Sequence, residues 1–119
     1  MLLYAWFKAF VLTQLIEMPL YVYTLSKALN LPIRPFRFSL STRLILIAFG
    51  ASAITHPFVW FIFPRALISQ PYWLYFLTAE SFAVIVEAWY LKFFGVSRFL
   101  AWSLLINGLS AGLGLLIYY

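Results

Sequence analysis

The chain of 119 residues contains no cysteine and little charge: charged residues make up 9%, and only three are acidic. Without cysteine the protein has no disulfide, no thiolate metal ligand and no cysteine nucleophile. Hydrophobic residues, in contrast, make up 66% of the chain and aromatic residues 22%, with a mean hydropathy of +0.98. A water-soluble fold could not bury so much apolar surface, so the composition predicts an integral membrane protein.

Four apolar runs are each long enough to cross a bilayer as a helix, because about 20 residues rising 1.5 Å each span its hydrocarbon core. The sequence therefore predicts an all-α bundle of four transmembrane helices with short loops, forming one transmembrane domain over residues 1–119. The first run lacks the basic start and small-residue cleavage site of a signal peptide, so we expect it to remain in the mature protein. The predicted helices cover residues 2–25, 44–63, 72–94 and 99–119.

The net charge of +5 comes from eight lysines and arginines that lie at the ends of these runs, which favours membrane topology over a nucleic-acid partner. With four helices, the first and third loops share one side of the membrane. That side carries six of the eight cations, so the positive-inside rule predicts that it is cytoplasmic and that both termini lie outside the cytoplasm. We expect a multi-pass protein of the cell membrane. The six are Lys27, Arg34, Arg37, Arg43, Lys92 and Arg98, against Lys8 and Arg65.

Aromatic residues near the helix ends are typical of the belts that lie at membrane interfaces. The inner belt is predicted to contain Tyr21, Tyr23, Trp89, Tyr90 and Trp102. The loop 26–43 alternates arginine with phenylalanine between and after two prolines, a pattern that suits a segment lying on the membrane surface. We therefore expect this cytoplasmic loop to bind anionic lipid headgroups.

All three acidic residues and the only histidine lie inside predicted helices. Counting about 1.5 Å per residue from the middle of each run, five polar residues fall within roughly 6 Å of the midplane, and every helix contributes at least one. An ionisable group at this depth is costly in lipid, so it normally faces a protein interior and marks a functional site. The five are Glu17, His56, Glu80, Glu87 and Asn107.

Three carboxyls, one imidazole and one amide, with no lysine or arginine at similar depth, favour a positively charged occupant. We therefore expect a small transporter that binds protons or a cation at Glu17, His56, Glu80 and Glu87, with Asn107 as a supporting donor. Oxygen and imidazole ligands also suit zinc, manganese or iron, so the same four residues are candidate ligands of a divalent metal cofactor. Nothing in the sequence is a recognisable metal-binding motif, and the cofactor stays open.

Two prolines and one glycine pair are expected to shape this site. Pro19 and Pro57 lack an N–H and should bend their helices, which would help to open the site to either side of the membrane. The GxxxG pair Gly108 and Gly112 permits close helix contact, either with a second copy of the chain or within it. Residues 50–53 offer small side chains for packing within the chain, which is the favoured interpretation.

The length, the helix number and the glutamate of the first helix resemble the small multidrug resistance transporters. In that family one glutamate of helix 1 binds both the proton and the cationic substrate, and Glu17 is the matching position. The additional acids, the histidine and the one-sided distribution of cations depart from that family.

The combination of glutamate, histidine and asparagine resembles the glutamic intramembrane proteases of the prenyl-processing type. This resemblance implies that a glutamate activates water as general base, while His56 and Asn107 orient the water or stabilise an oxyanion. The adjacent-glutamate motif of those proteases is absent, and Glu80 and Glu87 lie about 10 Å apart along the helix. An intramembrane hydrolase, protease- or lipase-like, is the alternative function, and an accessory subunit of a larger membrane complex is another.

Overall fold

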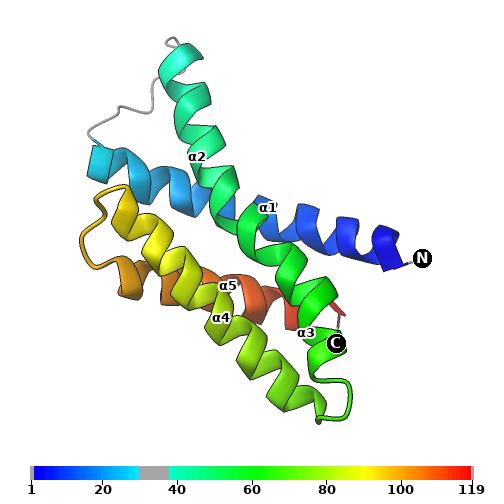
Figure 1. The fold of residues 1–119 in the computed structure, drawn as a ribbon. Coiled ribbons are helices and arrows are strands. Elements are labelled where there is room, and N and C mark those ends of the chain that lie inside the picture. The colour runs from blue at the N-terminus through cyan, green and yellow to red at the C-terminus, as the bar shows by residue number, and fades with distance from the viewer. Residues whose placement is uncertain (1, 30–37, 119) are drawn as a thin grey trace.

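The computed structural model describes residues 2–29 and 38–118, and this part of the chain contains helices and turns but no strand. A π-helical turn, η1, and the short helix α3 continue α2, so that residues 42–66 form one unbroken helical segment. Both termini lie at the same end of the molecule as α3 (Figure 1). The elements are α1 (Leu2–Leu29), α2 (Phe38–Pro57), η1 (Phe58–Ile62), α3 (Phe63–Ala66), α4 (Tyr72–Phe93) and α5 (Phe99–Tyr118).

The predicted all-α fold is confirmed, and each predicted span corresponds to one long helical segment. The largest differences lie at the first loop, because α1 continues to Leu29 and α2 begins at Phe38. The predicted loop over 26–43 was therefore too long at both ends. Lys27 lies in the last turn of α1, where a cation interacts favourably with the helix dipole and supports the longer helix. The predicted headgroup contacts of Arg34 and Arg37 lie outside the described residues.

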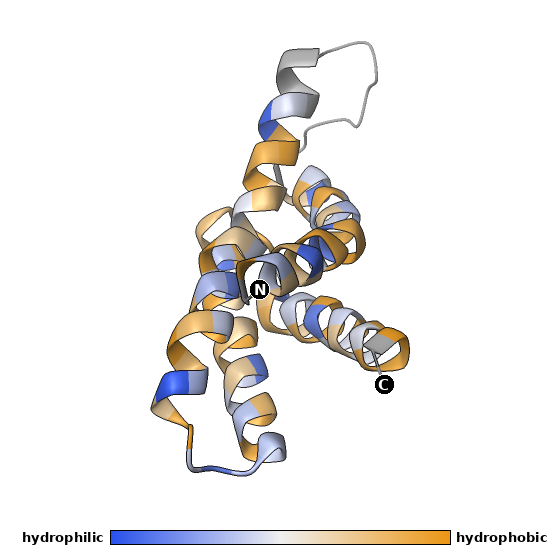
Figure 2. Ribbon diagram, turned by 90° about the vertical axis from the view of Figure 1, so that its right-hand side faces the viewer, coloured by the Kyte–Doolittle hydropathy of each residue, from blue (hydrophilic) through white to orange (hydrophobic). Residues whose placement is uncertain are grey.

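Polar and apolar residues are distributed in the opposite way to that of a water-soluble protein. Among the residues whose burial the structure describes, large apolar side chains such as Leu3, Ile68 and Leu116 are exposed, whereas nine polar residues are buried. Figure 2 shows the same pattern, with short hydrophilic segments on helices that are otherwise largely hydrophobic. Such an extended apolar exterior is stable against lipid but not against water.

Three helical segments of the described chain are long and apolar enough to cross a membrane: Thr42–Ala66, Tyr72–Phe93 and Phe99–Ile117. The helix α1 is long enough as well, with 28 residues, but Lys8, Gln14 and Glu17 interrupt its apolar character. That α1 forms a fourth span stays a prediction. Gln14 and Glu17 are both buried against the other helices, which removes two of the three polar side chains from the lipid-facing surface.

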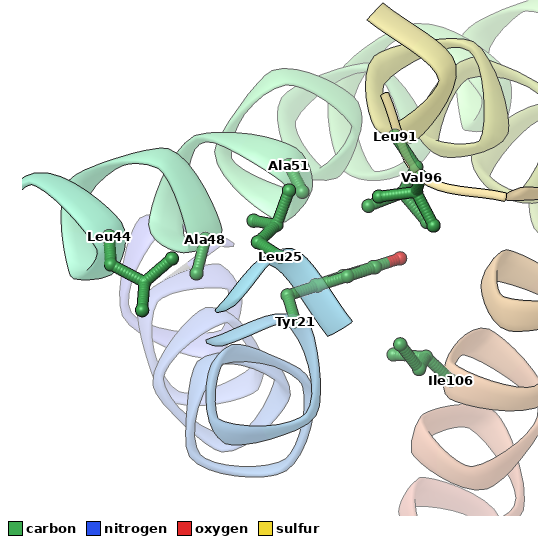
Figure 3. Packing of buried hydrophobic residues seen from close by; sticks show 8 residues of the cluster. All are labelled: Tyr21, Leu25, Leu44, Ala48, Ala51, Leu91, Val96 and Ile106. Carbon is green, nitrogen blue, oxygen red and sulfur yellow. The ribbon is translucent and has the colours of Figure 1, made fainter. Parts of the chain in front are cut away.

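Each long helix packs against two others. The helix α1 contacts α2 and α5, and α4 contacts the same two helices from the other side. At the end of the bundle near residues 94–98, an apolar cluster of buried residues packs between the helices (Figure 3), so this end of the bundle is closed. The cluster consists of Tyr21, Leu25, Leu44, Ala48, Ala51, Leu91, Val96 and Ile106.

The π-helical turn η1 follows from the positions of two prolines. The N–H of Phe63 bonds to the carbonyl of Phe58, five residues earlier, which is the π spacing. The residue five positions after Val59 is Pro64, which has no N–H to donate. The hydroxyl of Tyr75 on α4 replaces it and donates to the Val59 carbonyl at 2.8 Å. The sequence predicted a bend at Pro57, and the structure has this π turn directly after it.

The glycines of α2 and α5 have different surroundings. A Cβ at Gly50 would lie 2.6 Å from the Tyr90 hydroxyl, which itself donates to the Ile47 carbonyl at 2.6 Å. Gly50 thus permits a close contact between α2 and α4. Gly108 and Gly112 are exposed, and a Cβ at either would meet open space, so the predicted packing of this pair within the chain is wrong.

Candidate functional site

Two glutamates from different helices meet at the centre of the bundle. Glu17 of α1 and Glu87 of α4 are 3% and 1% exposed, and their carboxyl groups are close enough to hydrogen-bond to each other. The hydroxyl of Ser52 on α2 donates a short hydrogen bond to Glu17 Oε2 and lies 3.4 Å from Glu87 Oε1. Three helices therefore converge on one pair of carboxyls, which we call the carboxyl pair.

On the side of the apolar cluster, hydrogen bonds from other helices connect to the carboxyl pair. The hydroxyl of Tyr21, one turn after Glu17, donates to Glu87 Oε1 at 3.1 Å and accepts from Asn107 Nδ2 at 3.3 Å. Asn107 also donates to the Ser103 carbonyl at 3.0 Å. These contacts bring α5 into the site, so all four long helices contribute to it.

A cavity of about 690 Å³ lies next to the carboxyl pair, on the side away from the apolar cluster. Its deep end is lined by Glu17, Glu87 and Asn107, and its opposite end by residues such as Lys8, Pro64 and Tyr72, which are exposed. The cavity is therefore open at the end that carries both termini, and the apolar cluster closes the other end. The carboxyl pair forms the floor of this one-sided cavity.

His56 lies on the cavity wall rather than in the carboxyl pair. Its Nε2 is 3.4 Å from the hydroxyl of Thr13, one turn before Glu17, and its Nδ1 has no hydrogen-bond partner among the described residues. Three aromatic rings surround the imidazole at centroid distances of 5.3 to 6.2 Å, from Phe10, Trp6 and Trp60. These rings pack around the imidazole on the wall of the cavity that contains Glu17.

Glu80 occupies a third position. It lines the cavity two turns nearer the open end than Glu87, about 10 Å along α4, and is only half-buried. Of the four predicted site residues, the structure thus brings Glu17 and Glu87 together, with His56 and Glu80 on the walls of the same cavity. Among residues 2–29 and 38–118, no three histidine or acidic side chains are grouped so that they could share a metal ion.

Tyr21 and Ser52 also belong to the site, although sequence reasoning only placed each on the polar face of its helix and named neither as a candidate site residue. Tyr21 was predicted to lie in the inner aromatic belt, but it is fully buried and points into the bundle, so this prediction is wrong. The signal was present, since Tyr21 follows Glu17 by four residues and so shares its helix face. Ser52 likewise precedes His56 by four residues. Small hydroxyl residues are common in membrane helices, so the polar face of α2 alone does not show that Ser52 contacts the glutamates; the packing of α2 on α1 does.

Neither a family model, nor a curated protein, nor a solved structure matches this chain. The chain is therefore classified by its own architecture and by the residues at its centre. It is an all-helical protein with three helices able to span a membrane, a lipid-compatible exterior and a buried carboxyl pair at the floor of a one-sided cavity.

Proposed function

We propose that this protein is a small transporter that binds a cation at the carboxyl pair in exchange for a proton. The observation that carries the proposal is the direct contact of the Glu17 and Glu87 carboxyls in a buried site. Two charged carboxylates 4 Å apart would repel each other by about 4 kcal/mol even at an effective dielectric constant of 20. A proton shared between the two carboxyls removes this repulsion, and so does a bound cation.

The surroundings of the pair support exchange rather than permanent neutralisation. The nearest lysine on α1, Lys8, is nine residues from Glu17, about 14 Å along the helix. Glu87 Oε2 has no conventional donor among the described residues, so a proton on Glu17 is its natural partner. A monovalent cation that replaces this proton leaves the net charge of the site unchanged. The exchange therefore adds no uncompensated charge to the low-dielectric interior.

The charge distribution of the chain gives this transporter an orientation. Six of the eight lysines and arginines lie in residues 27–43 and 92–98, which include the adjoining helix ends as well as the loops, so we place that side of the protein in the cytoplasm of a cell membrane. The cavity then opens to the outside. In this state the carboxyl pair exchanges protons and cations with the external solution, and transport requires a second state in which the apolar cluster opens.

The proposal is tested by proton release from purified protein in lipid nanodiscs when sodium, potassium or methylammonium chloride is added. Wild-type protein should release up to one proton per bound cation, and Glu17→Gln and Glu87→Gln should abolish the release. Glu80→Gln is the matched control, because it removes a carboxyl from the same cavity outside the pair. Absence of proton release with all three cations, or release that survives both variants of the pair, would contradict the proposal.

Intramembrane hydrolysis is the second candidate, and the carboxyl pair itself favours it. Two carboxyls sharing one proton are also the arrangement with which acid dyads activate water. Asn107, however, donates to Tyr21 and Ser103, and His56 contacts Thr13 rather than a glutamate. Turnover of membrane-embedded peptide or ester substrates that is lost in Glu17→Gln and Glu87→Gln, without cation-induced proton release, would establish the hydrolase instead.

A further inference from the structure

A second hollow of about 330 Å³ lies between α4 and α5. It is on the outer surface of the bundle, because Gly108 and Gly112 on its wall are exposed and Leu104 is 60% exposed. Neither glycine has a side chain or a neighbour within 4 Å of an added Cβ, which leaves the wall of α5 low at these positions. In a bilayer this groove faces lipid.

The groove and the cavity have a common wall. Five residues line both, and they include Glu80 and Asn107 together with three apolar side chains. Asn107 also belongs to the network that holds the carboxyl pair. A molecule in the groove thus contacts residues that also line the cavity of the cation site. The five are Phe76, Glu80, Asn107, Ala111 and Leu115.

The chemistry of the groove selects its occupant. Its remaining wall is apolar, with Val84 and Leu104, and Glu80 is the only carboxyl that lines it. An inorganic ion gains nothing from apolar walls, whereas a molecule with an apolar body and one positive charge satisfies both the walls and Glu80. A volume of a few hundred cubic ångströms suits a small organic molecule.

We infer that a lipid-soluble organic amine in its ammonium form enters sideways from the bilayer through the α4–α5 groove, where Glu80 binds it before it reaches the carboxyl pair. This inference rests on the proposed function, because it names the class of cation that the pair receives. It assigns Glu80 a binding role distinct from the proton exchange of Glu17 and Glu87.

The test uses pyrenemethylamine, a membrane-soluble fluorescent amine, with the neutral pyrenemethanol as its matched partner. Binding to protein in lipid nanodiscs is measured by energy transfer from tryptophan to pyrene, and Trp60 on the cavity wall is a suitable donor. The amine should bind saturably and the alcohol about tenfold more weakly. Glu80→Gln should weaken amine binding by about tenfold and leave binding of the alcohol unchanged.

A second variant tests the groove without changing any charge. Gly112→Leu fills open space on α5, so it should fold normally while slowing amine association by about tenfold. Ala101→Leu, an exposed small-to-large change on α5 that lines neither hollow, is the control and should have no effect. Methylammonium enters from water, so the proton release that it causes should be normal in Gly112→Leu and in Ala101→Leu.

The outcomes separate this inference from the proposed function. If methylammonium releases protons from the wild type but Gly112→Leu and Glu80→Gln bind the amine normally, sideways entry is wrong and the cation site stands. If amine and alcohol bind equally, the groove holds only lipid chains. If Gly112→Leu instead dissociates a dimer, as a homo-oligomer through Gly108 and Gly112 predicts, the groove belongs to a second copy. Each of the last two results also overturns the inference.

Discussion

Tyr21 shows how one buried side chain links the two halves of the site. Its hydroxyl lies between Glu87 and Asn107, donating to the first and accepting from the second. A phenol suits this place because it combines one donor with lone pairs that accept. The ring, meanwhile, belongs to the apolar cluster that closes the bundle, so the same residue forms the lower boundary of the carboxyl pair and the top of the closed end.

Tyr21→Phe should therefore destabilise the protein by about 1 kcal/mol, the usual effect of losing a hydrogen bond between membrane helices. The ring and its packing are preserved, so the loss reports the hydroxyl alone. Unfolding in mixed micelles by a denaturing detergent measures the change. Tyr23→Phe, on an exposed side chain two residues away, is the control and should be neutral. Equal effects of the two substitutions would contradict the assigned role of the Tyr21 hydroxyl.

The close contact between Gly50 and the Tyr90 hydroxyl leads to a second prediction. Gly50→Ala places a methyl group where the Tyr90 hydroxyl lies, so the hydroxyl must move and lose its bond to the Ile47 carbonyl. We expect a loss of about 1–3 kcal/mol, typical of overpacking. Tyr90→Phe removes the clashing atom, so the double variant should be more stable than the sum of the two single effects predicts. Gly108→Ala, which meets open space, should be neutral; strictly additive effects of the pair at Gly50 and Tyr90 would refute the contact.

Among the helical elements, the segment α2–η1–α3 departs from regular α-helix because it contains two prolines and a π turn. Pro57 and Pro64 remove two N–H groups from one helical segment, and Tyr75 of α4 supplies the donor that the Val59 carbonyl lacks. The π turn also forms part of the cavity wall, since Val59, Pro64 and Tyr75 all line the cavity.

Tyr75→Phe should leave the Val59 carbonyl without its donor and destabilise the protein by about 1 kcal/mol. Pro64→Ala restores an N–H five residues after Val59, at the π spacing. The substitution Tyr75→Phe should therefore cost clearly less in the Pro64→Ala background than in the wild type, as measured by detergent unfolding. If Tyr75→Phe costs the same in both backgrounds, the hydroxyl does not replace the missing N–H.

At the scale of the whole molecule, the cavity is open at one end and closed at the other. The absence of native cysteine makes this asymmetry directly measurable, because every introduced cysteine is the only thiol. Ala9 lines the cavity, whereas Ala48 is fully buried in the apolar cluster at the closed end.

In intact cells or oriented vesicles, Ala9→Cys should react with a membrane-impermeant thiol reagent added from outside, and Ala48→Cys should not react from either side. Two exposed loop positions calibrate the sides: Ser69→Cys should react from outside and Ser97→Cys only from the cytoplasm. Reaction of Ala9→Cys from the same side as Ser97→Cys would contradict the proposed orientation of the cavity.

The sequence predicted the existence of the helices well because long apolar runs bounded by proline, glycine and charge leave little alternative in a membrane. It predicted the ends less well: α1 exceeds its predicted end by four residues, since apolar content does not decide whether Ser26 to Leu29 continue a helix. For the site it identified Glu17 and Glu87 by depth. It could not pair them, because depth ignores which face of each helix meets a neighbour.

Composition and residue order are enough to predict a helical membrane protein with acidic residues in the middle of its helices, because the cost of exposing apolar surface to water and polar groups to lipid acts on composition and order along the chain. The folded arrangement was needed to show that Glu17 contacts Glu87 rather than His56, that Tyr21 is buried, and that Gly108 and Gly112 face outward. These facts depend on how each helix is rotated about its axis, and that rotation is fixed by the packing of all the helices together.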